Sequence, residues 1–134
     1  MPPFTAEMIG RPILVFDLDD TLYLERDFVR SGFNAVGAHI AQAEGIAGFG
    51  DTCWDLFAGG TRHKVFDAAL AQAGLAQDAD IIARLVDVYR NHSPEITMAE
   101  DAAAFLSNGD RSTQAMITDG PEMTQKAKIA GLGI

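Results

Sequence analysis

Three carboxylates and a hydroxyl crowd the end of one apolar segment near the start of the sequence. Residues 13–16 read Ile-Leu-Val-Phe, and Asp17, Asp19, Asp20 and Thr21 follow directly. An unbroken apolar run of this kind is typical of a central strand that is covered on both faces. Acidic groups at its carboxyl end repel one another unless a cation or a catalytic task holds them there. Because open α/β sheets bind ligands at this edge, we predict an acidic, metal-dependent catalytic site.

A second apolar run has a polar end of a different kind. Residues 115–117 read Ala-Met-Ile, and Thr118, Asp119, Gly120 and Pro121 follow. Proline suits the first turn of a helix, so a helix should begin here with its free N–H groups facing the strand end. Such a helix start binds anions, and the Thr118 hydroxyl with the N–H groups of Asp119 and Gly120 would hold phosphate oxygens. The alternative is that Thr118 and Asp119 merely cap the helix.

Both segments resemble motifs of the haloacid dehalogenase-like (HAD) hydrolase superfamily. Residues 17–22, Asp-Leu-Asp-Asp-Thr-Leu, resemble its first motif, an Asp-x-Asp-x-Thr sequence that closes the first core strand. Residues 115–121 resemble its second motif, an apolar strand that ends in Thr or Ser. The resemblance implies an α/β fold, with a Rossmann-like core that is incomplete here (about two parallel strands) and an inserted α-helical cap of the C1 type.

The resemblance also implies roles for the acidic residues. Asp17 would be the nucleophile that forms an aspartyl-phosphate, and Asp19 would protonate the leaving alkoxide and then deprotonate the attacking water. Residues two apart in an extended segment point the same way, so both can flank one phosphorus. A Mg²⁺ ion would be held by the Asp17 carboxylate and the Asp19 backbone carbonyl. Asp20 is expected to be a solvated or turn-forming neighbour.

The second acid separates two branches of the family. True haloacid dehalogenases lack it, because expelling halide needs no proton, so Asp19 favours hydrolysis of a phosphomonoester over 2-haloacid dehalogenation. The implied substrate is a small phosphorylated metabolite of the sugar phosphate or nucleotide class. A non-catalytic phosphate- or partner-binding module is the alternative. Arg62, after Gly-Gly-Thr, is a possible substrate contact from the cap, or else a solvated side chain.

Helical periodicity occupies the stretch between the motifs. Apolar residues recur at three- to four-residue steps within residues 28–40, 65–73 and 81–89, and residues 98–106 should form a returning helix. Gly74 is expected to end one helix in a left-handed conformation, and Asp78 or Asp80 to cap the next. We therefore predict a cap at 24–96, with 1–23 and 97–134 as the core. A helical bundle with one strand pair is the alternative.

Composition narrows the class of protein. The chain has 134 residues, 48% hydrophobic and 22% charged, as is ordinary for a globular domain. A net charge of −9 argues against nucleic acid as a partner. The single Cys53 excludes an intramolecular disulfide and is expected to be a small core residue. No apolar run approaches the roughly 18 to 20 residues of a membrane span, so we expect a cytoplasmic protein with no membrane partner. The sequence indicates neither the individual substrate nor the oligomeric state.

Two lysines follow the second motif, but not where the family places its charge-neutralising lysine. Lys126 and Lys128 lie about 8 to 11 Å along the predicted helix from its start, at 1.5 Å per residue. We therefore expect both to be solvated and to offset the helix dipole. His39, His63 and His92 show no metal-ligand spacing and are expected to be surface or half-buried side chains.

The family's third-motif lysine and fourth-motif acids are not found before Ile134. We therefore expect the sequence to be a fragment of a longer phosphatase. The alternatives are a short natural chain that a partner completes, or a degenerate binding module. With two core strands, at about 12–17 and 115–118, unpaired sheet edges would invite association.

Overall fold

The computed structural model describes residues 12–109 and 113–134, which form two compact units. One unit combines the chain up to Asp27 with Ile96–Ile134, and the other is Phe28–Glu95. The sequence predicted the divisions after residues 23 and 96. Residues 1–11 of the predicted core segment lie outside the described part of the chain.

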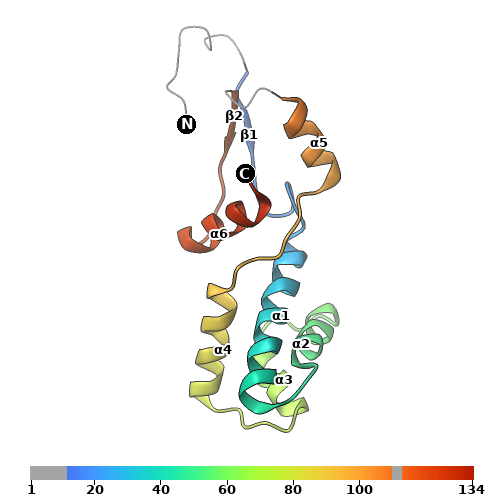
Figure 1. Cartoon of the computed structure of the whole chain (residues 1–134), viewed down its shortest axis with the longest axis vertical. Coiled ribbons are helices and arrows are strands. Elements are labelled where there is room, and N and C mark those ends of the chain that lie inside the picture. The colour runs from blue at the N-terminus through green and yellow to red at the C-terminus, as the bar shows by residue number, and fades with distance from the viewer. Residues whose placement is uncertain (1–11, 110–112) are drawn as a thin grey trace. The chain divides into compact units, whose positions relative to one another are not determined.

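The first unit is built on a pair of parallel strands from distant parts of the sequence. Strand β1 (Leu14–Phe16) pairs with β2 (Gln114–Met116), residue 14 opposite 114 and residue 16 opposite 116. Figure 1 shows the two strands side by side, with helix α5 (Glu100–Asn108) leading into β2 and helix α6 (Glu122–Leu132) following it. Parallel strands need a long crossover connection, and here it contains the whole second unit. The expected fold class, a partial Rossmann-like α/β core with a helical insertion, is confirmed.

The expectation of a strand buried on both faces is wrong for β1 in this chain. Leu14 and Val15 are 39% and 55% exposed. Phe16 is half-buried and meets the ring of Phe105 edge-on, with 6.0 Å between centroids. A strand that pairs along one edge within a small unit has few side chains above and below it. The unit instead buries Leu18, Leu22 and Tyr23, in and directly after the turn that follows the strand.

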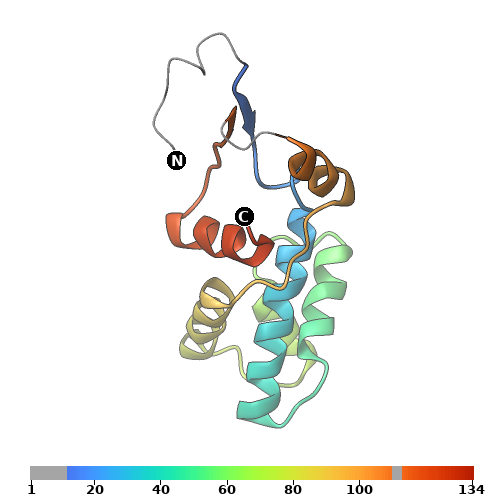
Figure 2. The same cartoon turned by 45° about the horizontal axis from the view of Figure 1, so that its top comes forward.

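The second unit is a bundle of four helices. These are α1 (Glu25–Glu44, which begins just before the unit boundary), α2 (Phe49–Ala58), α3 (Val65–Gln72) and α4 (Ala79–Asn91). In both Figure 1 and Figure 2, α1 lies between α2 and α4. The predicted helical segments are therefore confirmed. Their apolar faces form one core, which contains Phe33, Val36, Ile40, Phe49, Cys53, Ala69, Leu70 and Leu85.

Cys53 is a fully buried core residue, as expected. Burial raises the pKa of its thiol to about 12, so the thiol is protonated at neutral pH and is a poor nucleophile. Among the helices of the described residues, none is both long enough and apolar enough to cross a bilayer.

The predicted helix boundaries follow from local backbone chemistry. Gly74 takes φ +72°, the left-handed conformation that glycine adopts without strain. The N–H of Leu75 then donates to the carbonyl of Leu70 at 2.9 Å, which closes the end of α3. At the start of α4 the Asp78 carboxylate accepts from the N–H of Asp80 at 2.8 Å. Of the two predicted capping residues, Asp78 is therefore the cap.

Truncating the centre of the bundle should destabilise it strongly. Leu70 is fully buried, so Leu70→Ala is expected to lower the free energy of unfolding by about 2 to 5 kcal/mol. Gln72→Ala, at an exposed position of the same helix, should change it by less than about 0.5 kcal/mol. Urea unfolding followed by circular dichroism measures both. Equal effects for the two variants would contradict this placement of the core.

Candidate functional site

A tight turn directly after β1 carries the acidic residues. The N–H groups of Thr21 and Leu22 both donate to the carbonyl of Leu18, at 3.3 and 3.0 Å. Leu18, Leu22 and Tyr23 are buried beneath this turn. The turn brings Tyr23 back beside Asp19, and the Tyr23 hydroxyl donates to Asp19 Oδ1 at 2.5 Å. The buried side chains thus fix Asp19 at the end of the strand.

Helix α6 supplies two further donors to the same carboxylate. Lys128 Nζ lies 2.8 Å from Asp19 Oδ1, as an ion pair and hydrogen bond. Gln125 Nε2 donates to Asp19 Oδ2 at 3.0 Å. Residues three apart share one face of a helix, and this face is buried, with Gln125 5% and Lys128 4% exposed. Asp19 is therefore surrounded by donors from two parts of the first unit.

The end of the second strand joins the same network. Gln125 Nε2 also donates to the Thr118 hydroxyl at 2.7 Å. One amide therefore bridges the polar ends of β1 and β2. Gly120 makes this approach possible, since it takes φ +132° and a Cβ there would lie 3.1 Å from Gln125 Cδ. A side chain at position 120 would thus meet both backbone strain and a crowded neighbour.

Opposing effects act on the ionisation of Asp19. Partial burial raises the pKa of its carboxyl, but the hydrogen bonds from Lys128, Tyr23 and Gln125 and the charge of Lys128 outweigh burial and hold the pKa below its ordinary value. For Tyr23, burial and the hydrogen bond to the Asp19 carboxylate raise the pKa of the phenol. The pair therefore consists of a carboxylate and a neutral phenol over the physiological pH range.

The other two acids of the turn differ in their surroundings. Asp17 directly follows β1 and its side chain is exposed. Asp20 has φ 58°, and its carboxylate accepts from the N–H of Glu25 at 2.8 Å, at the start of α1. The expectation that Asp20 is a turn-forming neighbour is confirmed. Of the three acids, Asp17 thus offers an open carboxylate, whereas Asp19 is engaged by neighbours.

The remaining predicted phosphate ligands lie in the link between β2 and α6. Asp119 and Gly120 are exposed, and the N–H of Gly120 donates to the Asp119 carboxylate at 3.0 Å. Pro121 stands just before the first residue of α6, as predicted for this helix start. The structure brings Thr118 into the network around Asp19. An anion that takes the Gly120 N–H would have to displace the Asp119 carboxylate.

The donor chemistry of this strand end suits Mg²⁺. In the part of the chain that the structure describes, no three His, Cys, Asp or Glu side chains are grouped to hold a metal. Mg²⁺, however, keeps several waters and binds proteins through one or two carboxylates together with substrate phosphate. The exposed carboxylate of Asp17 and the backbone carbonyl of Asp19 are oxygen donors of this kind. They are the two protein ligands that would hold the ion.

The prediction that Lys128 is solvated is wrong, whereas Lys126 is exposed and pairs with Glu122 at 2.6 Å. That expectation rested on the distance along the helix axis from the predicted phosphate site. Asp19 instead lies beside α6, so the Lys128 side chain, from the second turn of the helix, reaches it laterally. The turn after β1 brings the carboxylate to this flank of the helix.

Sequence reasoning also missed Tyr23 and Gln125. The spacing of Gln125 and Lys128 places two polar residues on one helical face, and this was a usable signal. A second signal is that the apolar residues of α6 form no continuous stripe. Met123 is 80% exposed, so the helix turns a polar face toward its own unit. Tyr23 could not be recognised from the sequence, because its role depends on a hydrogen bond to Asp19 that only the fold shows.

Arg62 lies in the second unit and its guanidinium has local partners. Its Nη1 donates to the carbonyls of Phe57 and Thr61, at 2.5 and 3.2 Å. The guanidinium carbon also lies 4.0 Å from the centre of the Phe57 ring. The side chain is exposed and closes the link between α2 and α3. Its predicted contact with substrate stays a prediction.

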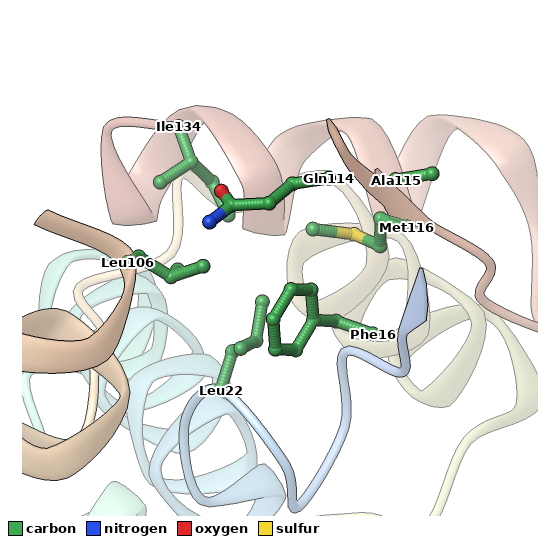
Figure 3. Close-up of a pocket in the computed structure, with 7 residues that line it drawn as sticks. All are labelled: Phe16, Leu22, Leu106, Gln114, Ala115, Met116 and Ile134. Atoms are coloured by element: carbon green, nitrogen blue, oxygen red, sulfur yellow. The ribbon is translucent and has the colours of Figure 1, made fainter. Parts of the chain in front are cut away.

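The first unit also contains an apolar pocket of about 190 Å³. In Figure 3, Phe16, Leu22, Leu106 and Met116 point toward one another around it. The other lining residues are Gln114, Ala115 and Ile134. None of the predicted site residues lines this pocket, and none of its lining side chains is an acid or a base. It is therefore distinct from the polar network around Asp19.

Comparisons with known proteins found similarity among solved structures. No protein-family model and no curated protein matches the chain, whereas eleven chains of solved structures do. One is YfnB from Bacillus subtilis, described as a HAD-hydrolase bound to magnesium (19% identity, TM-score 0.48, covering 91% of this chain and 58% of that one). A haloacid dehalogenase-like family hydrolase from Xanthomonas campestris has 20% identity and TM-score 0.42, with the same coverages.

A third similar structure is L-2-haloacid dehalogenase from Xanthobacter autotrophicus, with 20% identity and a TM-score of 0.42. The match covers 90% of this chain and 51% of that one. The present chain thus spans between 51% and 58% of the length of these three proteins.

The lowered pKa of Asp19 predicts a pH-dependent contribution to stability. In the unfolded chain an aspartate titrates near about 3.9, above its pKa in the folded state. The carboxylate therefore stabilises the fold fully above that value, and the stabilisation is lost as pH falls through the folded pKa. We expect the difference in unfolding free energy between the parent and Asp19→Asn to be largest above pH 5 and to shrink below pH 4. Urea unfolding across this range measures it, and a difference that is constant with pH would contradict the assignment.

Proposed function

We propose that this chain carries the catalytic strand ends of a Mg²⁺-dependent phosphomonoesterase that acts through an aspartyl-phosphate. One observation carries the proposal: a single amide, that of Gln125, contacts both Asp19 and Thr118. These are the residues that the motifs assign to proton transfer and phosphate binding. Because they meet beside the strand end that presents Asp17, nucleophile, acid and phosphate ligand share one edge of the sheet.

The reaction on these residues has two displacement steps. In the first, an Asp17 carboxylate oxygen bonds to phosphorus, the ester P–O bond breaks, and Asp19 gives a proton to the departing alkoxide. In the second, water attacks phosphorus while Asp19 removes its proton, and the bond between phosphorus and Asp17 breaks to release phosphate. Asp17 is exposed and able to reach a substrate, whereas Asp19 is fixed by neighbours, as a proton-transfer group must be.

The origin of the first proton depends on the ionisation of Asp19 in the free site. The free site holds Asp19 as a carboxylate, which suits the second step but cannot donate in the first. A phosphate monoester that enters as its monoanion carries the missing proton, since its second pKa is about 6. The proton then passes through Asp19 to the leaving oxygen, and the charge count stays balanced through both steps.

Mg²⁺ bound to Asp17 and to the Asp19 carbonyl would offset the repulsion between a carboxylate and a phosphate. Thr118 would donate its hydroxyl to a phosphate oxygen, and the N–H groups of Asp119 and Gly120 would follow once the Asp119 side chain moves aside. The substrate we propose is a small phosphorylated metabolite of the sugar phosphate or nucleotide class, as the resemblance of the two motifs implies. Dehalogenation would leave the proton-transfer role of Asp19 without use.

Hydrolysis of p-nitrophenyl phosphate with Mg²⁺ tests the proposal directly. Asp17→Asn removes the nucleophile at an exposed position and should lower kcat by a factor on the order of 10³ or more. Asp20→Asn is the matched control, because it removes an exposed carboxylate from the same turn while its side-chain oxygen can still cap α1. The control should keep the parent rate.

The outcomes separate the functional classes. Equal rates for the parent and Asp17→Asn would remove Asp17 as the nucleophile. If the parent hydrolyses nothing but binds inorganic phosphate, the chain is the non-catalytic binding module that the motifs leave as the alternative.

A further inference from the structure

The two oxygens of Asp19 are not equivalent. Oδ1 accepts from both the Tyr23 hydroxyl and Lys128 Nζ, whereas Oδ2 accepts from Gln125 Nε2. A carboxylate oxygen offers about two lone-pair directions. Oδ1 is therefore fully used by its two donors, while Oδ2 keeps one direction open. Of the two, Oδ2 is the oxygen on which a transferable proton can reside.

The side-chain amide of Gln125 also fixes the direction of the Thr118 hydroxyl. Its Nε2 carries two hydrogens, one directed at Asp19 Oδ2 and the other at Thr118 Oγ1. The opposite amide orientation would set a carbonyl oxygen against a carboxylate, so the assigned orientation is the favourable one. Because Thr118 accepts from Gln125, its own hydroxyl hydrogen is left to donate elsewhere. A phosphate oxygen is the acceptor that this site would bring.

We propose that Gln125 and Lys128 are positioning residues, which fix the Asp19 carboxylate and the direction of the Thr118 hydroxyl. Lys128 holds Oδ1 from one side of the carboxylate. Gln125 spaces the proton-transfer group from the phosphate ligand and orients both. The catalytic consequence rests on the function proposed above, whereas the contacts themselves do not.

The burial pattern of α6 argues against a purely packing role for this pair. Burying a lysine and an amide costs free energy, which their partners only partly offset. Apolar side chains at positions 125 and 128 would bury comparable area without that cost. The helix instead exposes Met123 and buries Gln125 and Lys128. The polar pair is therefore best explained by what it does for Asp19 and Thr118.

Leaving-group dependence distinguishes positioning from general damage to the site. Phenyl phosphate needs a proton on its leaving oxygen, whereas 2,4-dinitrophenyl phosphate does not, and the two esters are similar in size. Lys128→Met should lower kcat for phenyl phosphate by about 10²-fold, in the range of general acid catalysis, and kcat for the dinitrophenyl ester by less than about threefold. Lys128→Arg should recover most of the loss. Lys126→Met, on the exposed face of the same helix, should leave both rates unchanged.

Gln125→Met provides a second variant that removes no charge. It should lower kcat for phenyl phosphate selectively, and it should also raise KM for both esters, because the Thr118 hydroxyl loses its fixed direction. Equal losses of kcat on the two esters, in both Gln125→Met and Lys128→Met, would overturn the proposal. In that case the proposed function still stands if Asp17→Asn abolishes turnover.

A stability measurement tests the contact between Asp19 and Lys128 even if the chain hydrolyses no phosphate ester. The free energies of unfolding of the parent, Asp19→Asn, Lys128→Met and the double variant, measured in urea, form a thermodynamic cycle. Positioning through the direct contact predicts a double variant that is clearly less destabilised than the two single changes added together. Additive changes in the free energy of unfolding would overturn the contact, even for a chain that hydrolyses no phosphate ester.

Discussion

The ion pair between Asp19 and Lys128 holds the polar site of the first unit together. Lys128 is nearly inaccessible and the Asp19 carboxylate is largely covered, so removing either partner would leave the other charge buried without its counter-charge. Their contact, with 2.8 Å between Lys128 Nζ and Asp19 Oδ1, joins the turn after β1 to the second turn of α6. In the same arrangement Gln125 and Tyr23 donate hydrogen bonds to Asp19. The strand ends that carry Asp17 and Thr118 lie at one edge of the sheet.

Such a cross-link matters because the strand ladder itself is short. β1 and β2 pair over three residues each, and much of β1 is exposed. A ladder of this length contributes little to stability. The unit is held instead by the apolar side chains buried beneath the turn and by the polar contacts above it. The groups suited to chemistry are thus also groups that keep the two strand ends together.

The sequence predicted the general arrangement well. The apolar runs before Asp17 and Thr118 indicated two parallel strands, and the three- to four-residue spacing between them indicated the helices of the second unit. Gly74 and Pro121 marked helix boundaries because their backbone chemistry is local. The burial of β1 was not predictable in this way, since it depends on what covers the strand rather than on the strand's own residues.

The site was predicted only in part, for a physical reason. Asp17, Asp19 and Thr118 are recognisable because their residue types follow apolar strands. Gln125 and Lys128 act through a lateral contact between a helix and a turn that lie more than 100 residues apart in sequence. Distance along the helix axis placed Lys128 far from phosphate. What matters is which side of the helix faces Asp19, and only the fold defines that side.

The most direct measurement of the central claim is chemical trapping of the covalent intermediate. The chain would be mixed with Mg²⁺ and radiolabelled phosphate ester, quenched in acid within the first turnover, and digested for mass spectrometry. We expect phosphate on the carboxylate of Asp17, and none on that peptide in Asp17→Asn. Turnover of the ester without label on Asp17, or with label on a different residue, would contradict it.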